Sequence, residues 1–100
     1  MTTLLFDRIT AWQRKTFRES TPLSKLAHLK KEIEEVEFDI ASDINAEEEY
    51  ADCFLLLYGS AVKFGMSYDD INLAISRKMD KNEKRKWGKP DENGVVRHEK

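Results

Sequence analysis

Apolar residues recur at every third or fourth position along most of the chain, which is the spacing of helices that bury one face. In the second of these segments the apolar positions lie in steps of three and four from Leu26 to Ile40. Four segments share the pattern, and they extend over about residues 5–17, 22–40, 47–64 and 68–87. The pattern therefore predicts an all-α protein built from four helices.

Capping residues mark where the predicted helices begin and end. Thr21 can cap the second helix with Pro22 in its first position, or Ser24 can be the cap instead. Gly65 follows the third helix, where a residue in the left-handed conformation commonly ends a helix. Residues 67–70 resemble a capping box with Asp in place of the usual Glu, and we expect them to open the fourth helix.

The C-terminal segment breaks the helical pattern. Gly88 and Pro90 end the fourth helix, and residues 91–100 carry a turn-like Asn93–Gly94 pair. No regular element is predicted after that point. We therefore expect one helical domain over residues 1–90 and a C-terminal tail over residues 91–100.

Composition and charge narrow the class of protein. Of the 100 residues, 40% are hydrophobic and 36% are charged, with only four Gly and two Pro, which argues against a turn-rich β-sandwich. The net charge of −2 provides no basic field to gather nucleic acid or anionic lipid. Neither nucleic acid nor a membrane is an expected partner.

The cellular setting follows from the cysteine count and the lack of long apolar runs. Cys53 is the only cysteine, so it can form neither an intrachain disulfide nor a CxxC motif, and a cytoplasmic location is expected. Asp7 and Arg8 come too early for the apolar core of a signal peptide. No run approaches the ~20 apolar residues that a membrane span needs.

Acidic residues are segregated in the middle of the chain. Between Glu32 and Asp52 there are ten acidic residues and no Lys or Arg. Most such runs are solvated helix faces. Asp52 is different, because residues 50–62 are apolar almost all the way round and predict a helix buried on every side. A carboxylate there must be paired, protonated or bound to a cation.

Two pairs of acids share a spacing of three residues. Glu32 with Glu35, and Glu49 with Asp52, lie on consecutive helices that would bring four carboxylates together. An oxygen-rich set of this kind suits Mg²⁺ or Mn²⁺. Zinc and iron fit less well, and we expect His28 to be an exposed or hydrogen-bonded histidine rather than a ligand.

The predicted fourth helix changes character along one face. Its apolar stripe continues as Lys78, Asn82 and Arg85, at spacings of four and three. These side chains could donate to phosphate oxygens, or the helix could simply extend past the core into solvent. Aromatic residues such as Trp12 could likewise stack on a base or belong to the core.

In this order, the residues resemble the signature of the MazG-like, all-α nucleoside triphosphate pyrophosphohydrolases. That signature is E-x-x-E on one helix, E-x-x-D on the next and K-x-x-x-N-x-x-R downstream, and here it falls at residues 32–35, 49–52 and 78–85. The closest resemblance is to the dATP/dGTP pyrophosphohydrolase branch, through Ile-x-x-Trp-Gln at residues 9–13 and Asn93–Gly94 followed by His98. Nearly the whole chain is covered.

The resemblance implies a four-helix MazG-like fold and an enzyme. A nucleoside triphosphate, most simply a purine deoxynucleotide such as dATP or dGTP, would be hydrolysed to the monophosphate and pyrophosphate. Mg²⁺, with Mn²⁺ as a substitute, would be held by Glu32, Glu35, Glu49 and Asp52, and Glu35 would be the catalytic proton acceptor. Substrate contacts would come from Lys78, Asn82, Arg85, Trp12 and Gln13.

Two other functions and one state of assembly are also considered. A helical module that binds a protein partner has no reason to bury Asp52, and a catalytically silent nucleotide-binding domain has no reason to keep all four acids. The third predicted helix is apolar all round, and a chain of this length has few helices to enclose it. We therefore expect the bundle to be completed by homo-oligomerisation, as a homodimer or homotetramer.

Overall fold

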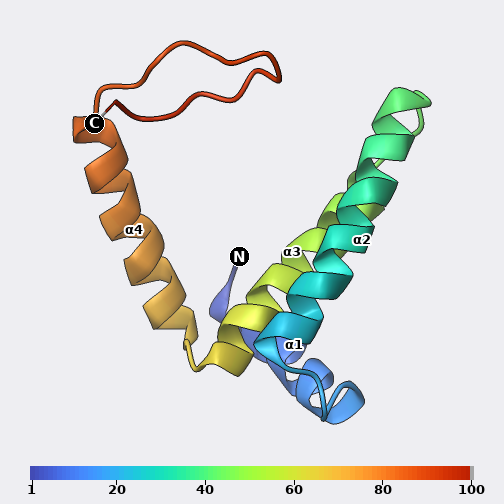
Figure 1. The fold of residues 1–100 in the computed structure, drawn as a ribbon. Coiled ribbons are helices and arrows are strands. Elements are labelled where there is room, and N and C mark those ends of the chain that lie inside the picture. Colours follow the sequence, from blue (N-terminus) through green and yellow to red (C-terminus); the bar gives the residue numbers. More distant parts are fainter. Residues whose placement is uncertain (100) are drawn as a thin grey trace. The chain divides into compact units, whose positions relative to one another are not determined.

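The computed structural model describes residues 1–99 and forms the four helices that the apolar spacing predicts. They are α1 (Thr3–Thr16), α2 (Pro22–Ala41), α3 (Glu47–Phe64) and α4 (Tyr68–Lys84), shown in Figure 1. The contacts divide the chain into two compact units, residues 1–68 and residues 69–100, which are described separately. Among the described residues, no helix is long and apolar enough to cross a lipid bilayer.

The start of α2 is fixed by a reciprocal capping box. Thr21 Oγ1 accepts a hydrogen bond from the backbone N–H of Ser24 at 3.0 Å, and Ser24 Oγ accepts one from the Thr21 N–H at 2.8 Å. Both candidate capping residues therefore take part, with Thr21 as the N-cap and Pro22 in the first turn. Ser60 Oγ on α3 donates to the Pro22 carbonyl at 2.9 Å, which ties the two helices together at this end.

α2 and α3 form an antiparallel hairpin in which they lie side by side (Figure 1). The short link between them turns through Asp43, whose φ of 57° lies in the left-handed region. α3 has the bounds that the sequence predicts, and it ends at Gly65, whose φ of 115° is easily adopted only without a Cβ. In this hairpin the acidic stretch of α2 lies opposite the first turns of α3.

α1 packs on α3 through one polar and one aromatic contact. Gln13 is buried, and its Nε2 donates to the Leu55 carbonyl at 3.0 Å. Gly59 makes room for it, because a Cβ at that position would lie 2.7 Å from Gln13 Oε1. Phe6 is buried edge-on to Tyr58, with ring centroids 6.2 Å apart.

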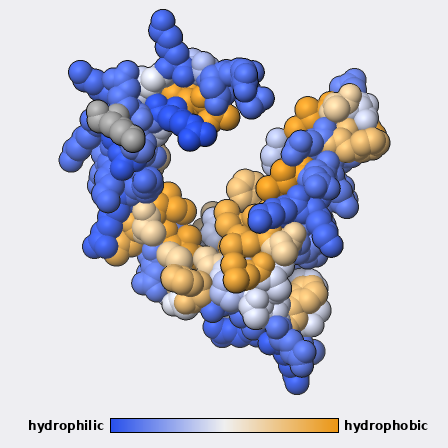
Figure 2. Space-filling view, in the orientation of Figure 1, coloured by the Kyte–Doolittle hydropathy of each residue, from blue (hydrophilic) through white to orange (hydrophobic). Residues whose placement is uncertain are grey.

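The expectation that α3 is buried on every side is wrong for the single chain. Phe54 and Leu57 are 60% and 53% exposed, because α3 packs chiefly on α2 and α1. Figure 2 shows hydrophobic residues at the surface over the helices of the first unit. One chain thus leaves a large part of its apolar surface uncovered.

In the second unit, α4 ends at Lys84, short of the predicted end near Trp87. The chain then folds back on itself, with hydrogen bonds from Gly88 N to Arg97 O at 2.8 Å and from Glu99 N to Lys86 O at 2.7 Å. The Asn93–Gly94 turn is confirmed. Asp91 Oδ1 accepts from the N–H groups of residues 93 and 95, each at 2.9 Å, and Gly94 has a φ of 78°.

Candidate active site

Glu32 is the most enclosed of the four predicted acidic ligands. Only 14% of its side chain is exposed, and its Oε1 lies 3.2 Å from His28 Nε2 on the preceding turn of α2. Its other oxygen, Oε2, is buried without a hydrogen-bond partner. An unpartnered buried carboxylate oxygen is costly, and it is the kind of group that a cation or a donor from a ligand would satisfy.

Glu35 lies one turn further along α2 and is exposed. Repulsion from Glu32, a hydrogen bond to the same side chain and a small loss of hydration raise the pKa of Glu35, and the charges of Glu49 and Asp39 add to the effect. The negative charges of α2 and α3 therefore act on one another at this place. Like charges close together favour a proton or a cation between them.

The two acids of α3 face those of α2 pairwise. Glu32 and Asp52 line one cavity together, and Glu35 and Glu49 line a second depression beside it. Glu49 is half-buried, whereas Asp52 is exposed, so its predicted burial is wrong for the single chain. The physical reason is that Asp52 lines an open cavity between the helices instead of a packed helix contact.

The four carboxylates gather without forming a closed ligand set. Among residues 1–99, no three side chains of His, Cys, Asp or Glu lie close enough together to hold a metal ion as they stand. The negative charges nevertheless act together on Cys53. Burial and the charges of Glu32, Asp52 and Glu35 all raise the pKa of its thiol. The site is a concentration of negative potential between α2 and α3.

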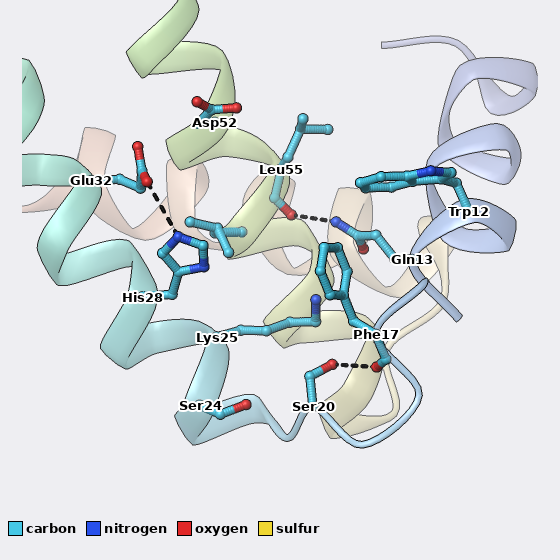
Figure 3. Close-up of a pocket in the computed structure, with 11 residues that line it drawn as sticks. Trp12, Gln13, Phe17, Ser20, Ser24, Lys25, His28, Glu32, Asp52 and Leu55 are labelled. Carbon is cyan, nitrogen blue, oxygen red and sulfur yellow. Dashed lines mark hydrogen bonds and ion pairs between the residues drawn. The ribbon is translucent and has the colours of Figure 1, made fainter. Parts of the chain in front are cut away.

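The cavity beside Glu32 and Asp52 has a volume of about 270 Å³ and an aromatic end away from the acids (Figure 3). Trp12 and Phe17 meet edge to face there, with ring centroids 5.3 Å apart. Gln13 also lines this end, held by its hydrogen bond to Leu55 O. The structure therefore brings two of the predicted substrate-binding residues, Trp12 and Gln13, into the same cavity as two of the acids.

A residue that the sequence analysis missed also lines this cavity. Lys25 is only 4% exposed, and its ammonium lies 5.0 Å from the centroid of the Phe17 ring. Burial, together with the charge of Lys63, lowers the pKa of Lys25. A signal was present, since Lys25, His28 and Glu32 are spaced by three and four residues and so share one face of α2.

The three predicted phosphate contacts belong to the second unit. Lys78 is exposed, whereas Asn82 and Arg85 are half-buried, and Arg85 follows the end of α4 directly. Asn82 Oδ1 is buried without a hydrogen-bond partner, while the Asn82 carbonyl accepts from Trp87 Nε1 at 3.0 Å. Trp87 itself packs edge to face on His98 within the unit.

The chain is similar to known proteins along nearly its whole length. A family model described as dATP/dGTP pyrophosphohydrolase matches residues 5–100. Among solved structures, the chain is similar to the cyanophage S-2L MazG-like pyrophosphohydrolase bound to dGDP and three catalytic Mn²⁺ ions per active site. The two share 32% sequence identity over 96% of this chain and 94% of that chain, with a TM-score of 0.79. No curated protein matches the chain.

Proposed function

The chain belongs to the dATP/dGTP pyrophosphohydrolase family, and on that premise we propose that it hydrolyses a purine deoxynucleoside triphosphate to the monophosphate and pyrophosphate. The observation that carries the proposal is the cavity that joins the aromatic end at Trp12 to the carboxylates of Glu32 and Asp52. A nucleotide has the same polarity, with an aromatic base at one end and anionic phosphates at the other.

The acids fit a divalent cation. The buried, unpartnered Oε2 of Glu32 is a free oxygen ligand, and the carboxylates of Glu35, Glu49 and Asp52 are hard donors of the type that Mg²⁺ and Mn²⁺ prefer. The similar cyanophage enzyme was solved with Mn²⁺. When bound, such cations would neutralise phosphate oxygens and activate a water.

The residues of this chain then have distinct proposed roles. Glu35, whose carboxyl is exposed to water, accepts the proton of the attacking water as the α–β anhydride bond breaks and pyrophosphate leaves. Trp12 and Gln13 contact the base from the wall of the cavity. Lys78, Asn82 and Arg85 supply donors to the phosphates or the sugar.

An end-point assay of all canonical triphosphates with Mg²⁺ tests this function. We expect release of pyrophosphate and a purine deoxynucleoside monophosphate, abolished by a chelator. Glu32→Gln should lose the activity, while Glu37→Gln, an exposed acid on the same helix, should keep it. Release of orthophosphate alone, or turnover that a chelator leaves untouched, would contradict the proposal. Nucleotide binding without any turnover would instead identify a silent nucleotide-binding domain.

A further inference from the structure

The ammonium group of Lys25 lies at the aromatic end of the cavity, and the proposed reaction gives it no role. The Lys25 side chain is 4% exposed and lines the cavity, with its ammonium directed at the face of Phe17 (Figure 3). Neither carboxylate of the cavity, Glu32 or Asp52, forms an ion pair with it. The ammonium itself is not sealed off from solvent, so its N–H donors stay open to the cavity and available to a ligand.

The other polar side chains at this end of the cavity are already engaged. Gln13 Nε2 donates to Leu55 O at 3.0 Å, Ser20 Oγ donates to Phe17 O at 2.7 Å, and Ser24 Oγ donates to the Thr21 carbonyl at 3.1 Å. The Lys25 ammonium has three N–H donors and accepts no hydrogen bond. Lys25 is thus the polar group at this end with the most unused donor capacity.

The position of Lys25 on α2 separates it from the phosphate end. It precedes Glu32 by seven residues, which is two turns of helix, or about 10 Å at the usual rise of ~1.5 Å per residue. Phosphates held near Glu32 and Asp52 would direct the base toward Trp12 and Phe17. Lys25 therefore meets the base edge of a bound nucleotide rather than its phosphates.

A donor-only group discriminates between the two purines. Guanine presents two acceptors, O6 and N7, on one edge, whereas adenine presents N7 beside an amino group that is itself a donor. An ammonium satisfies the guanine edge and meets a like donor on the adenine edge. Cytosine has the same defect as adenine, because its exocyclic amine is also a donor.

We propose that Lys25 is a specificity-determining residue that donates to the O6 and N7 edge of a guanine base in this cavity, so that 6-oxopurine triphosphates are preferred to dATP. This inference rests on the proposed function, because it assumes that the nucleotide lies with its phosphates at the acids. It deepens that function by choosing between the two purines. The lowered pKa of Lys25 agrees with it, since an acceptor from the ligand would restore the stability of the charged form.

Kinetics on four substrates test the inference. kcat/KM is measured for dGTP, dITP, dATP and the deoxynucleoside triphosphate of 2-aminopurine, which lacks O6, with the wild-type chain and with Lys25→Met. We expect Lys25→Met to lose about 5- to 150-fold on dGTP and dITP, the equivalent of ~1–3 kcal/mol for a good base contact. The values for dATP and the 2-aminopurine nucleotide, which keep N7 but lack O6, should fall much less. Lys30→Met, an exposed lysine of the same helix, is the control and should change none of them.

Each of the other outcomes also decides whether the inference holds. An equal loss on all four substrates would mean that Lys25 is only structural, and a wild-type preference for dATP would overturn the inference outright. If Lys25→Met does not fold, the wild-type ratio of dITP to the 2-aminopurine nucleotide still reports whether O6 is read. Binding of dGMP and dAMP, measured by calorimetry, separates the two proposals. A preference for dGMP without any triphosphate turnover would overturn the proposed function alone. Turnover without a guanine preference would overturn this inference alone.

Discussion

At the scale of single residues, the site is defined by polar groups that the fold leaves incompletely satisfied. Glu32 Oε2 is buried without a hydrogen-bond partner, and the Lys25 ammonium lies over the Phe17 ring with its donors open to the cavity. Both lie on one face of α2 and line the same cavity. Folded chains rarely retain such groups without a use, so each one predicts a measurable response to a ligand or to pH.

The first prediction concerns Mg²⁺ and stability. If Glu49 and Asp52 help to hold the cation, Mg²⁺ at a concentration of 100 Kd raises the free energy of unfolding of the wild-type chain by about 2.7 kcal/mol, because it binds the folded state, and the melting temperature rises with it. Glu49→Gln combined with Asp52→Asn should abolish that increment in a thermal denaturation experiment. Glu37→Gln should leave it intact. A double variant that keeps the full response would place the metal elsewhere.

The second prediction concerns alkaline pH. The pKa of Lys25 is lowered in the folded chain from 10.5, chiefly by burial and then by Lys63. Between the folded and unfolded pKa values, the unfolded chain binds more protons, so the free energy of unfolding rises with pH over that window. Lys25→Met should remove this rise in denaturant titrations at pH values just below 10.5, and Lys30→Met should not. Parallel pH curves for the wild-type chain and Lys25→Met would show that Lys25 is not desolvated.

Lys25 also shows where sequence reasoning ends at this scale. A lysine on an amphipathic helix is ordinarily solvated, and the spacing of Lys25 with His28 and Glu32 places it on their face of the helix without showing that it is buried. Its burial is created by Phe17, which comes from the link after α1 and covers the ammonium. The prediction that Asp52 is buried was wrong in the opposite sense. A helix that is apolar all round must have neighbours, but the pattern does not say whether the same chain supplies them.

At the scale of helices, prediction succeeded where a local signal ends the element. α3 ends at the predicted Gly65, and α2 begins at the predicted Thr21–Pro22 pair. The end of α4 depends instead on the returning segment, where Gly88 and Glu99 donate across to the other arm of the turn. That pairing is a contact between distant positions, which the helical pattern does not contain.

The third prediction tests how α1 is seated on α3. Alanine has a higher helix propensity than glycine by ~1 kcal/mol, so Gly59→Ala should stabilise α3 unless it displaces Gln13. The new Cβ would lie 2.7 Å from Gln13 Oε1, so the bond to Leu55 should break in the single variant. In a Gln13→Ala background, Gly59→Ala should therefore be more favourable by about 0.5–1.5 kcal/mol. Additive effects in denaturant unfolding would mean that Gln13 moves aside freely.

The fourth prediction concerns the polar stripe of α4. Lys78→Met keeps the length of the side chain and removes its charge, so a lost phosphate contact should lower kcat/KM by the equivalent of ~1.5–3 kcal/mol. Lys84→Met, at the last position of α4, serves as the matched control and should have little effect. Unchanged kinetics for Lys78→Met would show that Lys78 is only solvated.

At the scale of the whole molecule, the exposed apolar surface predicts that the active form is a homo-oligomer. Leu23 and Phe64 are each 77% exposed, and both line an apolar groove between α2 and α3 that also includes Leu57. Monomers rarely leave so much contiguous apolar surface in water, and a second copy would cover it most simply through a two-fold interface.

The last prediction follows from that surface. Leu57→Lys places a charge in the groove, so it should shift the mass measured by light scattering toward the monomer and lower the melting temperature of the assembly. Ser42→Lys, an exposed position in the link between α2 and α3, should do neither. Because stability and assembly are linked, dilution of the wild-type chain should reduce both melting temperature and activity together. A wild-type chain that is monomeric at micromolar concentration and keeps its activity would refute the oligomer, and the apolar groove would then need another occupant.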